Sequence, residues 1–342
     1  MRRKNKRWIA DILPAFFHSC LIFIVFIFGC FIFTPPDAAA QEPTSAENES
    51  EWQDSDDFPK LHISVKVNLV MHYASVTDKN NHFVSGLEQS RFRVFEDDAA
   101  QKIEFFAQED VPVSMGIVLD LSASMKGKID QVKQAALALL HASNPGDEYF
   151  LIGFNREVEL LHDYTGNIDE IGEALENVVV VGKTHLYDAV YLGVEKAQAG
   201  AKSKKAIVVI TDGNDDTSYY SLKELIDKIQ TSDVQVFCVG LLDDPPRKSI
   251  FGRWSYSGAK KYYDALVKIS EETGGNAFFP RNTYEIREIV DEIARDLRGQ
   301  YSIGYFSSNT AGYGTYRRIK IELTGKNTGG LTIRHRRGYY AP

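Results

Sequence analysis

In the middle of the chain, buried strands and amphipathic helices alternate, and this pattern limits the fold more than any other feature. Residues 113–119, 206–210 and 234–239 are nearly continuous apolar runs, as expected of parallel strands that are covered on both faces. Segments with helical periodicity, such as 129–140 and 186–199, lie between these runs. The alternation predicts an α/β fold, in which an open, mostly parallel sheet carries helices on both faces.

We assign this α/β domain to residues 111–298, because the same periodicities continue across that range. Further strands are expected at 149–154, 158–161 and 276–279, and further helices at 168–175, 221–230, 262–272 and 284–297. A domain of this size can bury a substantial apolar core without disulfide bonds.

Short strands are also expected on both sides of the α/β domain. Before it, apolar residues alternate with mostly polar ones at Leu61, Ile63, Val65, Val67, Leu69, Met71 and Tyr73, and further strands are expected at 92–95 and 102–106. After it, strands are expected at 301–306, 318–323 and 331–335. Neither group is large enough to be stable alone. We therefore predict that residues 61–107 and 299–342 pair into one small β-sandwich, with the α/β domain inserted between them.

The first forty residues have the layout of a secretory signal peptide. A basic start is followed by an uncharged apolar run at 21–33 and by an A-x-A cleavage pattern at 38–40. The run is shorter than the about 20 residues that a membrane span needs. We expect cleavage and export to the periplasm or beyond the cell. The alternatives are an uncleaved anchor that extends back to Trp8, and lipidation at Cys30. Residues 41–59, rich in acidic residues, Ser and Pro, are expected to be a flexible linker.

The composition is otherwise that of an ordinary globular protein, with 44% hydrophobic and 25% charged residues. A net charge of −8 gives no indication of nucleic-acid binding. Without residues 1–40, Cys238 is the one remaining cysteine, inside the apolar run 234–239. We therefore expect no internal disulfide and an inert buried thiol.

Oxygen-bearing side chains follow the strands at the edge where open α/β sheets bind ligands. The first strand leads into Asp120, Ser122 and Ser124, and the strand at 206–210 leads into Asp212. Thr184 lies in a loop just before a helix. All five are hard oxygen ligands, which suit Mg²⁺, with Mn²⁺ or Ca²⁺ as alternatives.

Two carboxylates and three hydroxyls leave a divalent cation incompletely neutralised. Mg²⁺ also prefers octahedral coordination and keeps waters where protein ligands run out. A site of this kind has an open position that favours an incoming carboxylate. The pattern therefore predicts a module that binds an Asp or Glu side chain of a partner protein.

The combination of D-x-S-x-S, a downstream Thr and a strand-terminal T-D-G resembles the metal-ion-dependent adhesion site of von Willebrand factor type A domains. The segments VTDKNNHFVSGLEQSRFRVFEDDAAQKIEFF, GKTHLYDAV, ETGGNAFFP and RRGYYAP resemble the VWFA-related, Acidobacteria-type family of exported bacterial proteins. The resemblance runs from about Leu61 to Pro342 and implies the fold and metal binding, but not the partner. Ala123 stands where relatives commonly carry Gly.

The candidate residues also have simpler interpretations. Asp120 and Asp212 would cap loops if they bound no metal. Asp215 and Asp216 would support the site from outside the ligand set, or be ordinary loop and cap residues. His185 is left out, because imidazole suits a site of hard oxygen ligands poorly.

An enzyme is not expected. The stretch from Asn177 to Thr184 resembles the phosphate-binding pattern G-x-x-x-x-G-K-[ST], but Asn177 replaces the first Gly and valines fill the loop. The sequence also contains no G-x-S-x-G or H-E-x-x-H motif and no cysteine cluster. Two hypotheses remain: a metal-dependent protein-binding module, and a structural or assembly protein whose metal only stabilises the fold.

Overall fold

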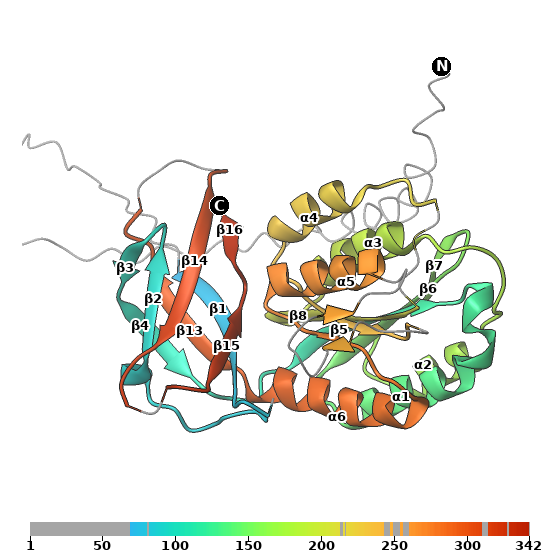
Figure 1. Cartoon of the computed structure of the whole chain (residues 1–342), viewed down its shortest axis with the longest axis horizontal. Coiled ribbons are helices and arrows are strands. Elements are labelled where there is room, and N and C mark those ends of the chain that lie inside the picture. Colours follow the sequence, from blue (N-terminus) through green and yellow to red (C-terminus); the bar gives the residue numbers. More distant parts are fainter. Residues whose placement is uncertain are drawn as a thin grey trace, which may run out of the picture. The chain divides into compact units, whose positions relative to one another are not determined.

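The computed structural model describes residues 69–80, 82–212, 215, 217–242, 247–248, 254–255, 260–309, 314–326 and 328–341 (Figure 1). These residues all belong to one compact unit, Ser64–Pro342. The expected signal peptide, the expected linker and the first part of the expected strand at 61–73 lie outside the described residues.

The central domain contains a six-stranded sheet with the order β12-β9-β8-β5-β6-β7. Its strands are β5 (Val113–Asp120), β6 (Glu148–Phe154), β7 (Val158–Thr165), β8 (Lys204–Thr211), β9 (Gln235–Gly240) and β12 (Ala277–Phe278). The neighbours pair in parallel except for β7, which runs antiparallel to β6. The predicted fold class, an open and mostly parallel α/β sheet, is therefore confirmed.

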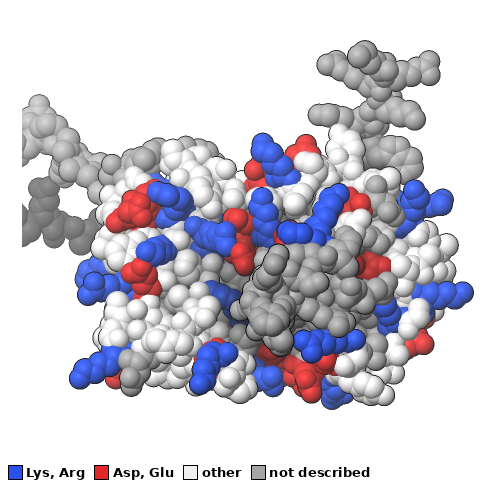
Figure 2. Space-filling view, in the orientation of Figure 1, with Lys and Arg blue, Asp and Glu red and all other residues white. Residues whose placement is uncertain are grey.

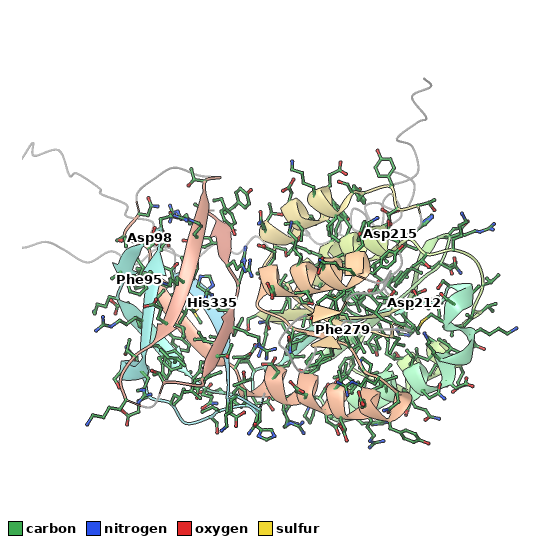
Figure 3. All side chains as sticks on the ribbon, in the orientation of Figure 1. Phe95, Asp98, Asp212, Asp215, Phe279 and His335 are labelled. Carbon is green, nitrogen blue, oxygen red and sulfur yellow. The ribbon has the colours of Figure 1, made fainter. Side chains whose placement is uncertain are left out.

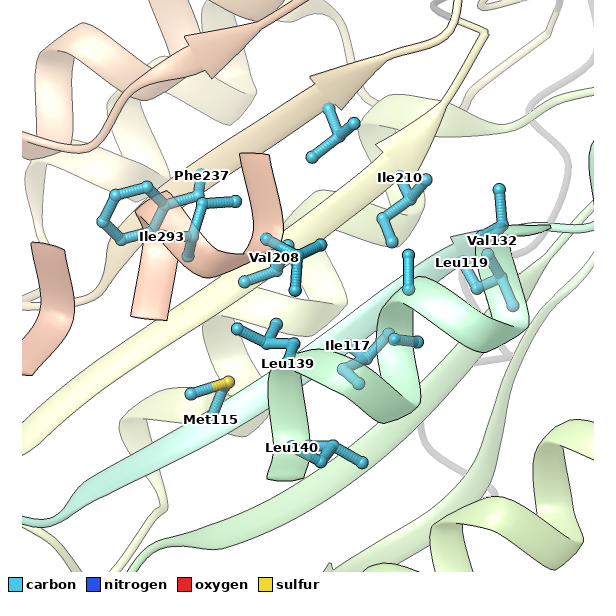
Figure 4. Close-up of a cluster of buried hydrophobic side chains, with 14 of the residues drawn as sticks. Met115, Ile117, Leu119, Val132, Leu139, Leu140, Val208, Ile210, Phe237 and Ile293 are labelled. Atoms are coloured by element: carbon cyan, nitrogen blue, oxygen red, sulfur yellow. The ribbon is translucent and has the colours of Figure 1, made fainter. Parts of the chain in front are cut away.

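Helices cover both faces of this sheet (Figure 1). One face carries α1 (Ile129–His141), α2 (Ile168–Glu176) and α6 (Thr283–Gly299), and the other carries α3 (Leu186–Gln198), α4 (Leu222–Gln230) and α5 (Lys260–Thr273). Every residue of β5 is buried, because both of its faces are covered. Met115, Ile117 and Leu119 enter the core on the α1 side (Figure 4), and Val118 enters the core on the opposite side.

The strands that flank the central domain form two four-stranded sheets, with the orders β15-β1-β13-β4 and β16-β14-β2-β3. The strands are β1 (Leu69–Thr77), β2 (Phe92–Glu96), β3 (Ala99–Gln101), β4 (Ile103–Ala107), β13 (Tyr301–Phe306), β14 (Tyr316–Leu323), β15 (Thr332–His335) and β16 (Gly338–Tyr340). In the first sheet β1 pairs with β13, and in the second β2 pairs with β14. Each sheet thus combines strands from before and after the central domain, and the two sheets bury one shared apolar core.

The sandwich core lies on the face of β1 opposite to Leu69 and Met71. Leu69 and Met71 are 44% and 37% exposed, whereas Ala74 and Val76 are fully buried between the sheets. The opposite face of β1 becomes covered near its end, where the Ser75 hydroxyl donates a hydrogen bond to a carboxylate on α6. Because a strand has two faces, a period of two residues does not say which face is the core.

Candidate metal centre

Asp120 lies at the carboxyl end of the central strand, where the sheet changes its direction of winding. From β5 the chain passes to β6 on one side, and later returns to β8 on the other side of β5. Such a switch point leaves a crevice at the carboxyl ends of the strands. The parallel register pairs Leu119 with Ile210, so Asp120 lies beside Thr211 and close to Asp212.

The Asp120 carboxylate is fully buried and accepts hydrogen bonds from Ser122 and Thr211. The Ser122 amide donates to Oδ1 at 2.9 Å, and the Thr211 hydroxyl donates to Oδ2 at 2.6 Å. Burial raises the pKa of Asp120 to about 6, these hydrogen bonds oppose the rise, and the nearby charge of Asp212 adds to it. Within the described part of the chain, no Lys or Arg forms an ion pair with Asp120. A bound cation would stabilise a buried carboxylate in this environment.

The two serine hydroxyls connect this buried carboxylate to the surface. Ser122 and Ser124 lie 3.0 Å apart, measured between their Oγ atoms. Ser122 is 1% exposed, whereas Ser124 belongs to the exposed start of η2 (Ala123–Gly127). The oxygen atoms proposed to bind the metal therefore extend from the carboxyl end of β5 to the solvent-exposed surface.

The loop that carries Thr184 lies along the D-x-S-x-S loop. The Val181 amide donates to the Leu121 carbonyl at 2.8 Å, and the Ala123 amide donates to the Gly182 carbonyl at 3.1 Å. Gly182 has a φ of +91°, which favours glycine and turns the chain toward Thr184. Thr184 is 2% exposed and lies just before α3.

The acidic residues that follow β8 have different neighbours. Asp212 comes directly after the strand and acts electrostatically on Asp120. Asp215 lies farther along (Figure 3), and its Oδ1 accepts hydrogen bonds from the Ser218 hydroxyl and from the Tyr187 amide in the first turn of α3. Asp215 therefore satisfies a backbone amide at the start of α3. Asp216 lies outside the described residues.

Two further hydrogen bonds lie beside the site. The His185 Nε2 atom lies 2.7 Å from the Thr217 hydroxyl, so this ring nitrogen has a protein partner. The Val181 amide, in the stretch that resembles a phosphate-binding pattern, donates to the Leu121 carbonyl. Thr211 is a residue that our sequence reasoning missed: it belongs to the T-D-G motif, but nothing local indicates its bond to Asp120.

The donor set fits a hard divalent cation such as Mg²⁺. Among the described residues, no cluster of three or more His, Cys, Asp or Glu side chains forms a metal site. The proposed ligand set has only two carboxylates, and its other three ligands are Ser and Thr hydroxyls. Asp120 supplies the buried charge that such an ion would neutralise.

Comparison with known proteins agrees with this fold. Residues 115–214 match the von Willebrand factor type A domain family, and the chain therefore contains a domain of this type. The chain is 23% identical over 232 residues to bovine inter-alpha-trypsin inhibitor heavy chain H4, covering 60% of this chain and 23% of that protein. It is 29% identical over 125 residues to the porcine heavy chain H1, covering 32% of this chain and 14% of that protein. The chain thus spans about a quarter or less of the length of these relatives.

Similarity to solved structures is found as well. A von Willebrand factor type A protein from Catenulispora acidiphila has a TM-score of 0.45 and 13% identity, covering 80% of this chain and 72% of that one. Proximal thread matrix protein 1 from the mussel byssus, in a structure with a zinc-occupied MIDAS motif, has a TM-score of 0.44 and 15% identity. That match covers 56% of this chain and 49% of the mussel protein.

Proposed function

We propose that this protein is an exported binding module that holds a divalent cation and, through it, binds an Asp or Glu side chain of a partner protein. The proposal rests above all on the buried Asp120 carboxylate, which lies at a sheet edge and has no basic partner among the described residues. The residues that would hold the ion are Asp120, Ser122, Ser124, Thr184 and Asp212.

The exposure of the site favours binding over a purely structural role. A cation that only stabilises a fold is normally enclosed by protein ligands. Here the donors extend from the buried Asp120 to the exposed Ser124, so one side of an ion held by them would face solvent. When bound, the cation supplies positive charge that attracts a carboxylate. A structural or assembly protein, stabilised by the metal alone, is the second candidate.

The partner is proposed to be a protein, because von Willebrand factor type A domains typically bind protein partners. On the face shown in Figure 2, Lys and Arg side chains are interspersed with Asp and Glu, and neither sign gathers into a large patch. Together with the net charge of −8, this pattern does not favour nucleic acid as the partner. We propose no catalytic activity.

Export is proposed from the sequence of residues 1–40, which lie outside the described residues. Among the helices that the structure describes, none is both long enough and apolar enough to cross a membrane. We propose that any attachment to a membrane is through the N-terminal segment, if it stays uncleaved.

The test compares partner capture by immobilised protein in Mg²⁺ and in chelator. We expect capture in Mg²⁺ to be lost in chelator and in Thr184→Ala, which removes one ligand without a change of charge. Ser90→Ala, which removes a hydroxyl on the sandwich, is the matched control and should capture as wild type. Capture that is indifferent to chelator, while the melting temperature still rises with Mg²⁺, would favour the structural role.

A further inference from the structure

We propose that this site prefers an acidic residue with an aliphatic neighbour, and that the exposed side chains of Val179 and Val181 contact that neighbour. The inference rests on the proposed function and specifies the class of partner: an extended segment in which Asp or Glu lies next to Val, Ile or Leu.

The four valines before Gly182 alternate between core and solvent. Val178 and Val180 pack against the core on the α1 side of the sheet. Val179 is 68% exposed and Val181 is 56% exposed. The fold therefore accounts for the apolar character of two of these positions only, since a polar side chain at 179 or 181 would be well solvated.

The segment that carries the two exposed valines lies beside the proposed metal ligands at Val181 and Gly182. The Val181 amide is bonded to the Leu121 carbonyl at 2.8 Å, between Asp120 and Ser122 in the sequence. The next residue, Gly182, accepts from the Ala123 amide at 3.1 Å, between Ser122 and Ser124. A carboxylate bound at the site would thus bring its neighbouring residues within reach of this segment.

Basic side chains around the same loops complement an acidic partner. Lys126 is exposed in η2, and Lys183 is exposed directly before Thr184. The exposed Arg156 lies against the loop, with its Cγ 3.2 Å from the position that a Cβ on Gly182 would take. Positive charge beside an aliphatic surface fits a segment that carries both a carboxylate and an apolar residue. Burial of two half-exposed valines is expected to change affinity by about tenfold.

The experiment uses synthetic hexapeptides that each contain one central Asp, with Leu, Ser or Gly as its neighbour, immobilised and probed with the whole protein. We expect the wild type to bind the Leu peptide about tenfold more tightly than the Ser and Gly peptides in Mg²⁺, and to bind none in chelator. Val179→Ser/Val181→Ser should lose this preference but still bind Asp peptides in Mg²⁺. Leu160→Ser, which changes a 47% exposed leucine on β7, should behave as wild type.

Each outcome decides between the two proposals. A preference for Leu that survives in the double variant, or a wild type with no preference, overturns the inference and leaves the metal-dependent binding of carboxylates standing. No Mg²⁺-dependent binding of any Asp peptide overturns both. Calorimetry with Mg²⁺ alone checks that the double variant keeps an intact site. If it does not, the single variant Val179→Ser, at the more exposed position, decides in its place.

Discussion

The Thr211 hydroxyl donates a 2.6 Å hydrogen bond to Asp120 Oδ2 and so ties the end of β8 to the end of β5. Both residues are fully buried. The bond fixes one oxygen of the carboxylate, while the Ser122 amide holds the other. The orientation of the proposed metal ligand therefore depends on a residue that is not itself a proposed ligand.

Thr211→Val should weaken Mg²⁺ binding by roughly fivefold, because it removes a buried hydrogen bond that orients Asp120 and is nearly isosteric. Thr211→Ser keeps the hydroxyl and serves as the control, with affinity close to wild type. Titration calorimetry measures both. Equal affinities for the valine and serine variants would show that the bond does not position the carboxylate.

Mg²⁺ affinity should fall as the pH drops below about 6. Burial raises the pKa of Asp120 to about 6, and a proton on this carboxylate competes with the cation. Below this pKa the affinity should decrease about tenfold for each pH unit. Calorimetric titrations with Mg²⁺ from pH 5 to pH 8 test this prediction. The binding of Ca²⁺ to EDTA, corrected for the known protonation of EDTA, checks the method over the same range. An affinity that stays constant down to pH 5 would contradict the assignment.

His72 should make the sandwich sensitive to acid. It is buried against the Tyr305 ring, and burial, with the charges of Arg336 and His335, lowers its pKa to about 3. Because the folded pKa is below the unfolded value of 6.5, the contribution of neutral His72 is complete above pH 6.5 and is lost as the pH falls toward 3. His72→Phe should remove about 2 kcal/mol of the stability difference between pH 7 and pH 5.

Urea unfolding at the two pH values measures this difference for both proteins. Phenylalanine keeps a ring beside Tyr305, so the native packing is largely retained. An identical pH dependence in wild type and His72→Phe would mean that His72 is not the acid-sensitive group.

Arg334 should contribute to stability far more than an exposed basic residue. It pairs with Asp296 on α6 at 2.6 Å, and the Asp296 side chain is only 3% exposed. Arg334→Gln leaves that carboxylate without its ionic partner and should cost about 3 kcal/mol of unfolding free energy. The matched control is Lys320→Gln, in an exposed pair with Glu322, where less than 1 kcal/mol is expected. Similar losses in the two variants would refute the distinction.

The α/β core was predictable because covered parallel strands leave continuous apolar runs. Very short strands, and strands with apolar residues on both faces, could not be predicted in this way. β16 (Gly338–Tyr340) is too brief to produce a pattern, and β1 carries apolar residues on both faces. Its core side depends on which face meets the other sheet, and this is a long-range property.

The candidate site divides in the same way. The spacing of Ser122 and Ser124 is local, and the structure brings their hydroxyls together. The bond from Thr211 to Asp120 joins residues 91 positions apart and has no local signal. The exposure of Val179 could not be predicted from the sequence either, because a run of four valines has the composition of a buried strand.

Calorimetric titration with Mg²⁺ tests directly whether Asp120 is a ligand of a divalent cation. We expect the wild-type protein to bind one ion per chain, and Asp120→Ala to bind none while it still unfolds cooperatively. Binding of Mg²⁺ to Asp120→Ala with wild-type affinity, or no binding to the folded wild type by Mg²⁺, Mn²⁺ or Ca²⁺, would contradict this role of Asp120.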